Sequence, residues 1–326
     1  MANAYAGIRA SKFRRVRDGK TLIDGMPVVP TLGDIWWVDG TNGAASNTGK
    51  APNDAFALLA TALTKVDQHD IVYVMAKEMA ASDSDPGNYA ETVTISVPQI
   101  SVIGVGRGPV QGGLPQFKIG AGSTVMISVE APGVTLENLG INGASSTGGG
   151  IKLRADGSTM DANGAIIRGC HFKNCKGSSS TNAATGGAVM LSGAPWQVLI
   201  EGNRFYKNVA DVVLLDTNNS VPQDVVIQDN EFSDSGATTD CNVYLAGGSG
   251  PGIGLTIARN IFGIQPAVSS GSNAVFAVLT GADGGMYCGN FFGTDGTHGA
   301  TGNAAKIPTT VFIAGNYDEG GLVART

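Results

Sequence analysis

One pattern of hydrophobic and polar positions recurs along the chain, and residues 198–205, VLIEGNRF, show it clearly. With Asn203 as the reference, the equivalent positions are Leu139, Cys170, Asn203, Asn230, Asn260, Asn290 and Asn316. The steps between them are 31, 33, 27, 30, 30 and 26 residues. A nearly fixed period with one short strand pattern per copy is typical of a solenoid. Because no helical pattern lies inside the copies, the sequence predicts a β-solenoid.

Two apolar columns flank the reference position. Three residues earlier stand Leu136, Ile167, Ile200, Ile227, Ile257, Tyr287 and Ile313. Two residues later stand Ile141, Phe172, Phe205, Phe232, Phe262 and Phe292, and Asp318 breaks this column. In stacked coils, equivalent positions lie about 4.8 Å apart. We therefore expect both columns to face inward as continuous apolar stacks, with two strands in each coil.

The polar reference column predicts a structural ladder. Its asparagines are Asn203, Asn230, Asn260, Asn290 and Asn316. Asparagine tolerates the left-handed backbone of a sharp turn, and its amide can bond to the amides above and below. Buried polar groups in proteins are usually satisfied in this way. We expect these residues to hold the bend of each coil rather than to bind a ligand.

The segment before the repeats contains the one convincing helical pattern, near 54–66. Its apolar positions at helical spacing are Phe56, Leu59, Ala60, Leu63 and Val66. Asn53 or Asp54 could cap its start. A helix here would cover the open end of the solenoid, whose strand edges could otherwise recruit other chains. We expect 35–326 to form one domain that includes this capping helix.

The motif order in this region resembles a known family. It runs WVDG, a Gly/Asn-rich loop, PNDAFALLATAL, DIVYVM and then VIGVGRG at 102–108. This order is similar to the N-terminal cap and first coils of pectate-lyase-like right-handed parallel β-helix proteins. The family includes polysaccharide lyases, glycoside hydrolases and many bacteriophage tailspike and virion proteins. From 35 to the end of the chain, the resemblance implies an all-β, single-stranded right-handed parallel β-helix.

Residues 1–34 differ in charge from the rest of the chain. Among the first twenty residues, the basic side chains are Arg9, Lys12, Arg14, Arg15, Arg17 and Lys20, and Asp18 is the one acidic side chain. The local charge is +5, against −11 for the remainder. Charge-rich termini are often solvated tails, but an extended basic arm could lie on another copy, another protein or nucleic acid. The repeats lack a basic face with interleaved aromatics, so we favour a protein partner and expect no nucleic acid.

Candidate catalytic residues are few. A glycosidase needs two carboxylates roughly 5–10 Å apart, and the nearest candidates are Asp211, Asp216, Asp229, Glu231 and Asp234. For the polygalacturonase-like branch, the resemblance implies a paired Asp-Asp and a Gly-His-Gly. This chain has neither, and His69, His171 and His298 are scattered. The pectate-lyase branch implies calcium-binding carboxylates beside a basic residue. Arg168, Arg204 and Arg259 lie near the turn in their copies, but exposed ion pairs explain them more simply. We expect no catalytic residue, metal or cofactor.

Cysteine spacing and hydropathy restrict the cellular setting. Cys170, Cys175, Cys241 and Cys288 form no CxxC pair, which favours buried free thiols. No apolar run approaches the roughly 18 residues of a membrane helix. The N-terminus also lacks the apolar core of a secretory signal. We expect folding in the cytoplasm and no membrane partner.

The longer loops are expected to gather along one edge of the rod. They are 144–149, 177–187, 233–240, 265–273 and 294–303. Each follows the phenylalanine column, so stacking brings them to the same corner, where a glycan could bind. Their Ser/Thr/Gly/Asn composition is equally typical of solvated turns. Trp196 is a further candidate for stacking on a sugar, although it could simply cover a turn.

These features lead to one functional hypothesis and two alternatives. We expect a bacteriophage virion structural protein, a capsid decoration or cement protein assembled in the host cytoplasm and anchored to the major capsid protein or another virion protein by segment 1–34. We expect it to form a homotrimer, in line with the symmetric assembly of most oligomers. The alternatives are a tailspike-like polysaccharide depolymerase, which would be a lyase or glycoside hydrolase, and a glycan-binding adhesin without catalysis.

Overall fold

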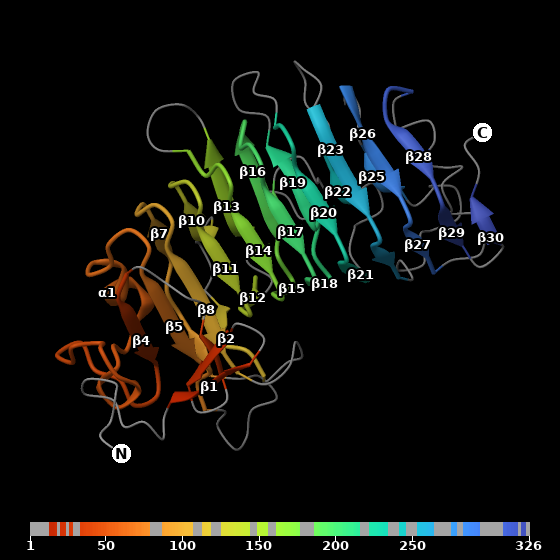
Figure 1. Cartoon of the computed structure of the whole chain (residues 1–326). Helices are drawn as coiled ribbons and strands as arrows, with labels where there is room; N and C mark the ends of the chain where they lie inside the picture. The colour runs from red at the N-terminus through yellow and green to blue at the C-terminus, as the bar shows by residue number, and fades with distance from the viewer. Residues whose placement is uncertain are drawn as a thin grey trace.

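The computed structural model describes residues 33–78, 87–106, 113–118, 125–143, 149–155, 161–176, 186–215, 222–233, 241–245, 253–263, 275–278, 283–293, 309–318 and 321–323. It also describes the backbone of three strands within 13–28. From β4 to β30, the strands follow one another along a single axis, so that the molecule is elongated (Figure 1).

Three long sheets build the rod, which we call sheets I, II and III. Sheet I contains β4 (Ile35–Asp39), β5 (Ile71–Met75), β8 (Ser101–Val105), β11 (Thr135–Glu137), β14 (Ile166–Arg168), β17 (Leu199–Glu201), β20 (Val226–Gln228), β23 (Ile253–Ala258), β26 (Asp283–Cys288) and β28 (Phe312–Ala314). Sheet II contains β6 (Asn88–Tyr89), β9 (Gln116–Lys118), β12 (Gly140–Asn142), β15 (His171–Lys173), β18 (Arg204–Tyr206), β21 (Glu231–Ser233), β24 (Ile261–Phe262), β27 (Phe291–Phe292), β29 (Asn316–Asp318) and β30 (Gly321–Val323). Sheet III contains β7 (Val93–Ile95), β10 (Val125–Val129), β13 (Gly149–Ala155), β16 (Val189–Gly193), β19 (Val212–Leu215), β22 (Cys241–Tyr244) and β25 (Val275–Val278).

Neighbouring strands in each sheet come from successive coils and run parallel, except for β29 and β30. In sheet I, Ile200 pairs with Ile227, which pairs with Ile257. This register confirms the parallel β-helix. The expectation of two strands per coil is wrong, because the corner at Asn203 divides VLIEGNRF into β17 and β18, which belong to different sheets.

Both apolar columns pack inside the coils. Phe172, Phe205, Phe232, Phe262 and Phe292 are buried and stack with ring centroids 4.8–5.2 Å apart. Asp318 pairs with Phe292 in the next strand and ends this stack. Burying each aromatic ring removes about 150–250 Å² of surface from water, so the repeated column supplies a large part of the folding free energy.

The predicted helix near 54–66 is shorter than its apolar pattern suggested. The structure has a 3₁₀ helix, η1 (Pro52–Asp54), and a separate α-helix, α1 (Leu59–Leu63). Between them, Phe56 donates a backbone hydrogen bond to the Trp37 carbonyl of β4. This extended pairing interrupts the helix. In the part of the chain that the structure describes, no helix is long and apolar enough to cross a membrane.

The start of α1 is capped from another part of the chain. The carboxylate of Glu91 accepts hydrogen bonds from the backbone N–H groups of Leu59 and Ala60, at 3.0 and 2.8 Å. Asn53 and Asp54, the expected caps, lie in η1. A carboxylate suits this position because the first N–H groups of a helix lack backbone partners. This helix lies beside β4 at one end of the rod (Figure 1).

Within segment 1–34, the described residues form β1 (Phe13–Arg17), β2 (Lys20–Ile23) and β3 (Met26–Val28). They pair antiparallel in the order β1-β2-β3, so this part is a small meander and not an extended arm. Arg14, Arg15 and Arg17 lie on β1 and Lys20 on β2. Arg9 and Lys12 lie outside the described residues. The partner-binding role of these six basic residues stays a prediction.

The buried cysteines are free thiols. Cys170 and Cys175 are buried, whereas Cys288 is partly exposed. Burial raises the pKa of the Cys170 thiol to about 12, so this thiol stays protonated and unreactive at neutral pH. The side chain of Cys241 lies outside the description.

Candidate binding site at the asparagine corner

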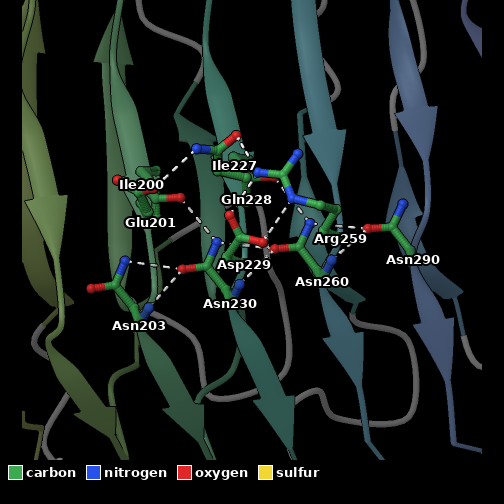
Figure 2. A network of polar contacts seen from close by, with 10 residues as sticks. All are labelled: Ile200, Glu201, Asn203, Ile227, Gln228, Asp229, Asn230, Arg259, Asn260 and Asn290. Carbon is green, nitrogen blue, oxygen red and sulfur yellow. Dashed lines mark hydrogen bonds and ion pairs between the residues drawn. The ribbon is translucent and has the colours of Figure 1, made fainter.

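The asparagine ladder lies at the corner between sheets I and II (Figure 2). Asn230 Oδ1 accepts from the backbone N–H and the Nδ2 of Asn203, at 2.9 and 3.0 Å. Its Nδ2 donates to the Ile200 carbonyl at 2.9 Å and to Asn260 Oδ1 at 3.0 Å. Asn260, Asn290 and Asn316 continue the same arrangement. All five ladder asparagines are buried and hydrogen-bonded.

The left-handed backbone position at this corner is not the asparagine itself but the residue before it. These residues, all with φ between 55° and 65°, are Asn138, Gly169, Gly202, Asp229, Arg259, Gly289 and Gly315. Most are glycine or asparagine, the residues that adopt this conformation at least cost. A Cβ on Gly202 would meet no atom within 4 Å. A side chain at this position therefore points away from the core.

Asp229 and Arg259 occupy this left-handed position in adjacent coils and bind each other. Arg259 Nε donates to Asp229 Oδ1 at 2.8 Å, and its Nη2 donates to Oδ2 at 2.7 Å. The same Nη2 donates to Gln228 Oε1 at 2.9 Å, and Gln228 Nε2 donates to Glu201 Oε1 at 3.1 Å. Figure 2 shows this network beside the ladder. The bonds to Asp229 raise the Arg259 pKa.

An open pocket with a volume of about 350 Å³ lies at this corner. Its lining residues are Gly202, Asn203, Arg204, Asp229, Asn230, Glu231, Arg259 and Ile261. Arg204 Nε donates to Glu231 Oε2 at 2.8 Å. The middle coil thus supplies two carboxylates, and the coils on either side supply one guanidinium each. The four charges cancel, and all four side chains are partly exposed to solvent.

This pocket can both accept hydrogen bonds from a ligand and donate hydrogen bonds to it. Each carboxylate has acceptor capacity beyond its arginine contacts. Within the described residues, the Nη1 groups of Arg204 and Arg259 have no hydrogen-bond partner. Ile261 adds an exposed apolar surface at the rim. A volume of this size falls at the lower end of the range of small-ligand sites, roughly 300–1,000 Å³.

The other carboxylate candidates do not meet at one place. Asp211 is fully buried and accepts hydrogen bonds from Asn208 Nδ2 at 2.9 Å and Asn242 Nδ2 at 2.7 Å, so its role is structural. Asp216 and Asp234 lie outside the described residues. Among the residues that the structure describes, no group of three or more His, Cys, Asp or Glu side chains could hold a metal ion.

The remaining candidates are spread over the rod. Arg168 forms a 2.9 Å ion pair with Glu137 on sheet I. This pair agrees with the expectation that the arginines near the turn form exposed ion pairs. His171 lies on β15 and His69 before β5, whereas His298 lies outside the described residues. Trp196 is exposed in the turn before β17. Most residues of the expected loop edge also lie outside the description, and the pocket occupies a different corner.

All four charged residues of the pocket were candidates from the sequence, but nothing in the sequence grouped them as one site: Asp229, Glu231, Arg204 and Arg259. The available signal was the column just before the ladder asparagine. Four of its seven members are glycine, so the neighbouring Asp229 and Arg259 are the charged exceptions. Treating the turn position as a column of its own would have placed both side chains on the same outer corner.

Comparisons with known proteins support the fold. No protein-family model matches the sequence, and no curated protein matches it. The crystal structure of Escherichia coli YbhC is similar over 96% of this chain and 92% of that chain, with a TM-score of 0.51 and 10% identity. The pectin methylesterase from Aspergillus niger has a TM-score of 0.47 and 11% identity over 90% of this chain and 87% of its own. The GH136 lacto-N-biosidase from Eubacterium ramulus has a TM-score of 0.39 and 11% identity over 89% and 68%.

At such low identity, these likenesses concern the fold alone. The likeness to YbhC agrees with the right-handed parallel β-helix fold that the motif order from 35 onward predicted. Several of the similar structures are carbohydrate-active enzymes.

Proposed function

We propose that this protein binds a glycan at the asparagine corner. The observation that carries the proposal is the pair Asp229 and Arg259, which occupies strained turn positions where most other coils have glycine. A left-handed conformation costs a residue such as Arg259 about 1–2 kcal/mol, whereas an aspartate adopts it more readily. An exposed ion pair returns little of that cost. Strain of this kind in exposed residues points to a function outside the fold.

The charge pattern of the pocket selects the chemical class of the ligand. A purely anionic ligand would meet Asp229 and Glu231, and a purely cationic ligand would meet Arg204 and Arg259. Adjacent sugar hydroxyls can donate to the carboxylates and accept from the guanidinium groups at the same time. The apolar face of a sugar ring can pack against Ile261. A neutral oligosaccharide satisfies all of these groups together.

The same geometry favours binding over hydrolysis. A glycosidase needs one protonated carboxyl as the acid, facing a second carboxylate. Both pocket carboxylates accept hydrogen bonds from arginines. These contacts favour the charged form of each carboxyl group, which can accept hydrogen bonds from sugar hydroxyls but cannot donate a proton. Catalysis is therefore the alternative proposal, and a depolymerase reaction would release new reducing or unsaturated ends.

A double variant tests this proposal. Asp229→Gly with Arg259→Gly restores the residue type of the neighbouring turns and leaves no partner charge unpaired. Titration calorimetry with a panel of neutral and acidic oligosaccharides should show binding by the wild type and at least about tenfold weaker binding by the variant, a loss of roughly 1.4 kcal/mol.

Arg168→Ala is the matched control because it removes an equivalent ion pair between coils, on sheet I and outside the pocket lining. It should bind like the wild type. Binding of the double variant at wild-type affinity, or no binding of any panel member by the wild type, would contradict the proposal. Release of new sugar ends during the incubation would establish the depolymerase instead.

We further propose that the protein is a bacteriophage virion structural protein, a capsid decoration or cement protein anchored to the particle through segment 1–34. Support comes from the separate three-stranded sheet of β1–β3, which carries Arg14, Arg15, Arg17 and Lys20 and, among the described residues, pairs with no strand of the rod. A separate basic unit ahead of an acidic rod suits attachment to a protein surface. Deleting 1–34 should abolish incorporation into particles and leave the rod folded. Normal incorporation would exclude this segment as the anchor.

A further inference from the structure

A row of exposed apolar side chains lies on the outer face of sheet II, toward the C-terminal end of the rod. Its members are Ile261, Phe291, Tyr317 and Leu322, which we call the apolar row. They lie on β24, β27, β29 and β30 and face one another in register across these adjacent strands. Their exposed fractions are 50, 44, 50 and 66%.

The interior of the coil does not require this row. The equivalent outward positions on earlier strands are His171, Arg204 and Glu231, although the buried phenylalanines beside them are the same. Four large side chains about half exposed present on the order of 400 Å² of apolar surface, which is the size of the largest patch on a typical soluble monomer, and such a patch is often functional. The row is therefore a candidate contact surface.

We propose that the apolar row is a contact surface between two copies of this chain. Spacing is the first reason. Neighbouring side chains in the row are about 4.8 Å apart, the separation of strands in a sheet. The gaps between them therefore repeat at the same distance. A second copy presents side chains and gaps with this repeat, so that two rows can interlock around a symmetry axis.

Area and charge also favour a second copy. A stable interface covers about 800 Å² on each partner, with an apolar centre and a polar rim. The row supplies about half of that area as the centre. Beside it, Arg204 and Glu231 neutralise each other within one chain. Two copies with a net charge of −6 each can therefore meet here without strong repulsion.

The candidate pocket and the apolar row share Ile261, so a second copy that covers this side chain would compete with a glycan for it. The proposal itself does not depend on glycan binding. It locates a contact between copies, whereas the trimer expected for the chain stays a prediction.

Sedimentation velocity of the full chain over a range of concentrations tests the contact. The wild type should form a dimer or larger closed oligomer. Phe291→Ser with Tyr317→Ser should weaken association by at least about a hundredfold, because two buried aromatic anchors are lost. Thermal melting should show that the variant is folded, since both side chains are exposed in one chain.

Met286→Ser with Phe312→Ser is the matched control. These two side chains are also exposed neighbours in register, 45 and 62%, but they lie on sheet I. The control should associate like the wild type. A wild type that stays monomeric at high micromolar concentration, or Phe291 and Tyr317 substitutions that leave the oligomer unchanged, would overturn the proposal. Equal dissociation by both double variants would also overturn it, because the contact would then not be specific to the row.

Discussion

The outer face of sheet II has two regions built on one interior. At the outward position just before the phenylalanine column, β15, β18 and β21 carry His171, Arg204 and Glu231, whereas β24, β27 and β29 carry Ile261, Phe291 and Tyr317. Beneath both regions run one phenylalanine stack, which extends from Phe172 to Phe292, and one asparagine ladder, which extends from Asn203 to Asn316. In this β-helix, the inward side of the repeat is fixed by folding, and the outward side is free to differ along the rod.

The strongest test of the shared interior is to remove one ladder asparagine from each region. Asn230→Ala leaves the backbone N–H of Asn203 and the Ile200 carbonyl without their side-chain partner, and Asn290→Ala does the same to Asn260 and Ile257. Each unsatisfied group costs about 1–3 kcal/mol, so we expect the free energy of unfolding to fall by about 4 kcal/mol in both variants. Denaturant titration measures this loss of unfolding free energy. Clearly unequal losses would show that the two regions do not share one interior.

Adjacent residues on β27 separate the interior from the outer face. Phe292→Ala removes a buried ring from the stack and should cost about 3–5 kcal/mol of unfolding free energy. Phe291→Ser changes an exposed side chain and should alter the stability of the monomer by less than about 0.5 kcal/mol. Thermal melting of both variants, at a concentration where the protein is monomeric, compares their stabilities with that of the wild type. A large loss for Phe291→Ser would mean that the apolar row stabilises its own chain.

The cost of the left-handed turn can be measured separately from the charge. Gly202→Ala adds a Cβ that meets no atom within 4 Å, at φ +62°. We expect a loss of about 1 kcal/mol from backbone strain alone. By the same reasoning, Arg259→Gly should relieve strain at φ +55°. Denaturant titration of both variants tests this, and an unchanged Gly202→Ala protein would remove the argument from strain.

The smallest expected effect is a pH dependence confined to the polar region. Burial, followed by Lys173 and Arg204, lowers the pKa of His171 in the folded state. Its stabilising contribution is therefore complete above the unfolded pKa near 6.5. It is lost as the pH falls from there through the folded pKa, because the unfolded chain binds the proton more readily.

His171→Gln should flatten that part of the stability curve. Thermal melting between pH 7.5 and 4.5 compares the variant with the wild type, with Phe291→Ser as a control without a titratable group. An equally steep curve for His171→Gln would assign the pH dependence to other groups.

Much of the fold could be predicted from the sequence because its columns are local and repeated. The isoleucine and phenylalanine columns have the alternation of a short strand, and stacking turns each column into a ladder. The α1 cap was missed because its partner, Glu91, comes from a later coil, more than thirty residues away. The prediction of two strands per coil was wrong because the corner between β17 and β18 has only two residues, Gly202 and Asn203, and leaves no gap in the apolar pattern.

The candidate site could be predicted less well. Arg204, Asp229, Glu231 and Arg259 belong to three coils, and their distances depend on register between coils. The sequence alone contains a signal for the apolar row. Ile261, Phe291 and Tyr317 each stand one residue before the phenylalanine column, at a position that faces outward if the column faces inward. That interpretation needs the direction of every strand first, since a shift of one residue exchanges the inner and outer faces.

The sequence by itself determined a stacked β-rod with an apolar interior and a polar ladder, because a repeated short pattern can bury its apolar side only against its own neighbours. Tertiary structure decided which residue of each turn takes the left-handed conformation and which charges meet across coils. It also decided which apolar side chains face outward. These properties depend on the exact stacking of one coil on the next, a relation between residues about thirty positions apart that no single copy of the pattern contains.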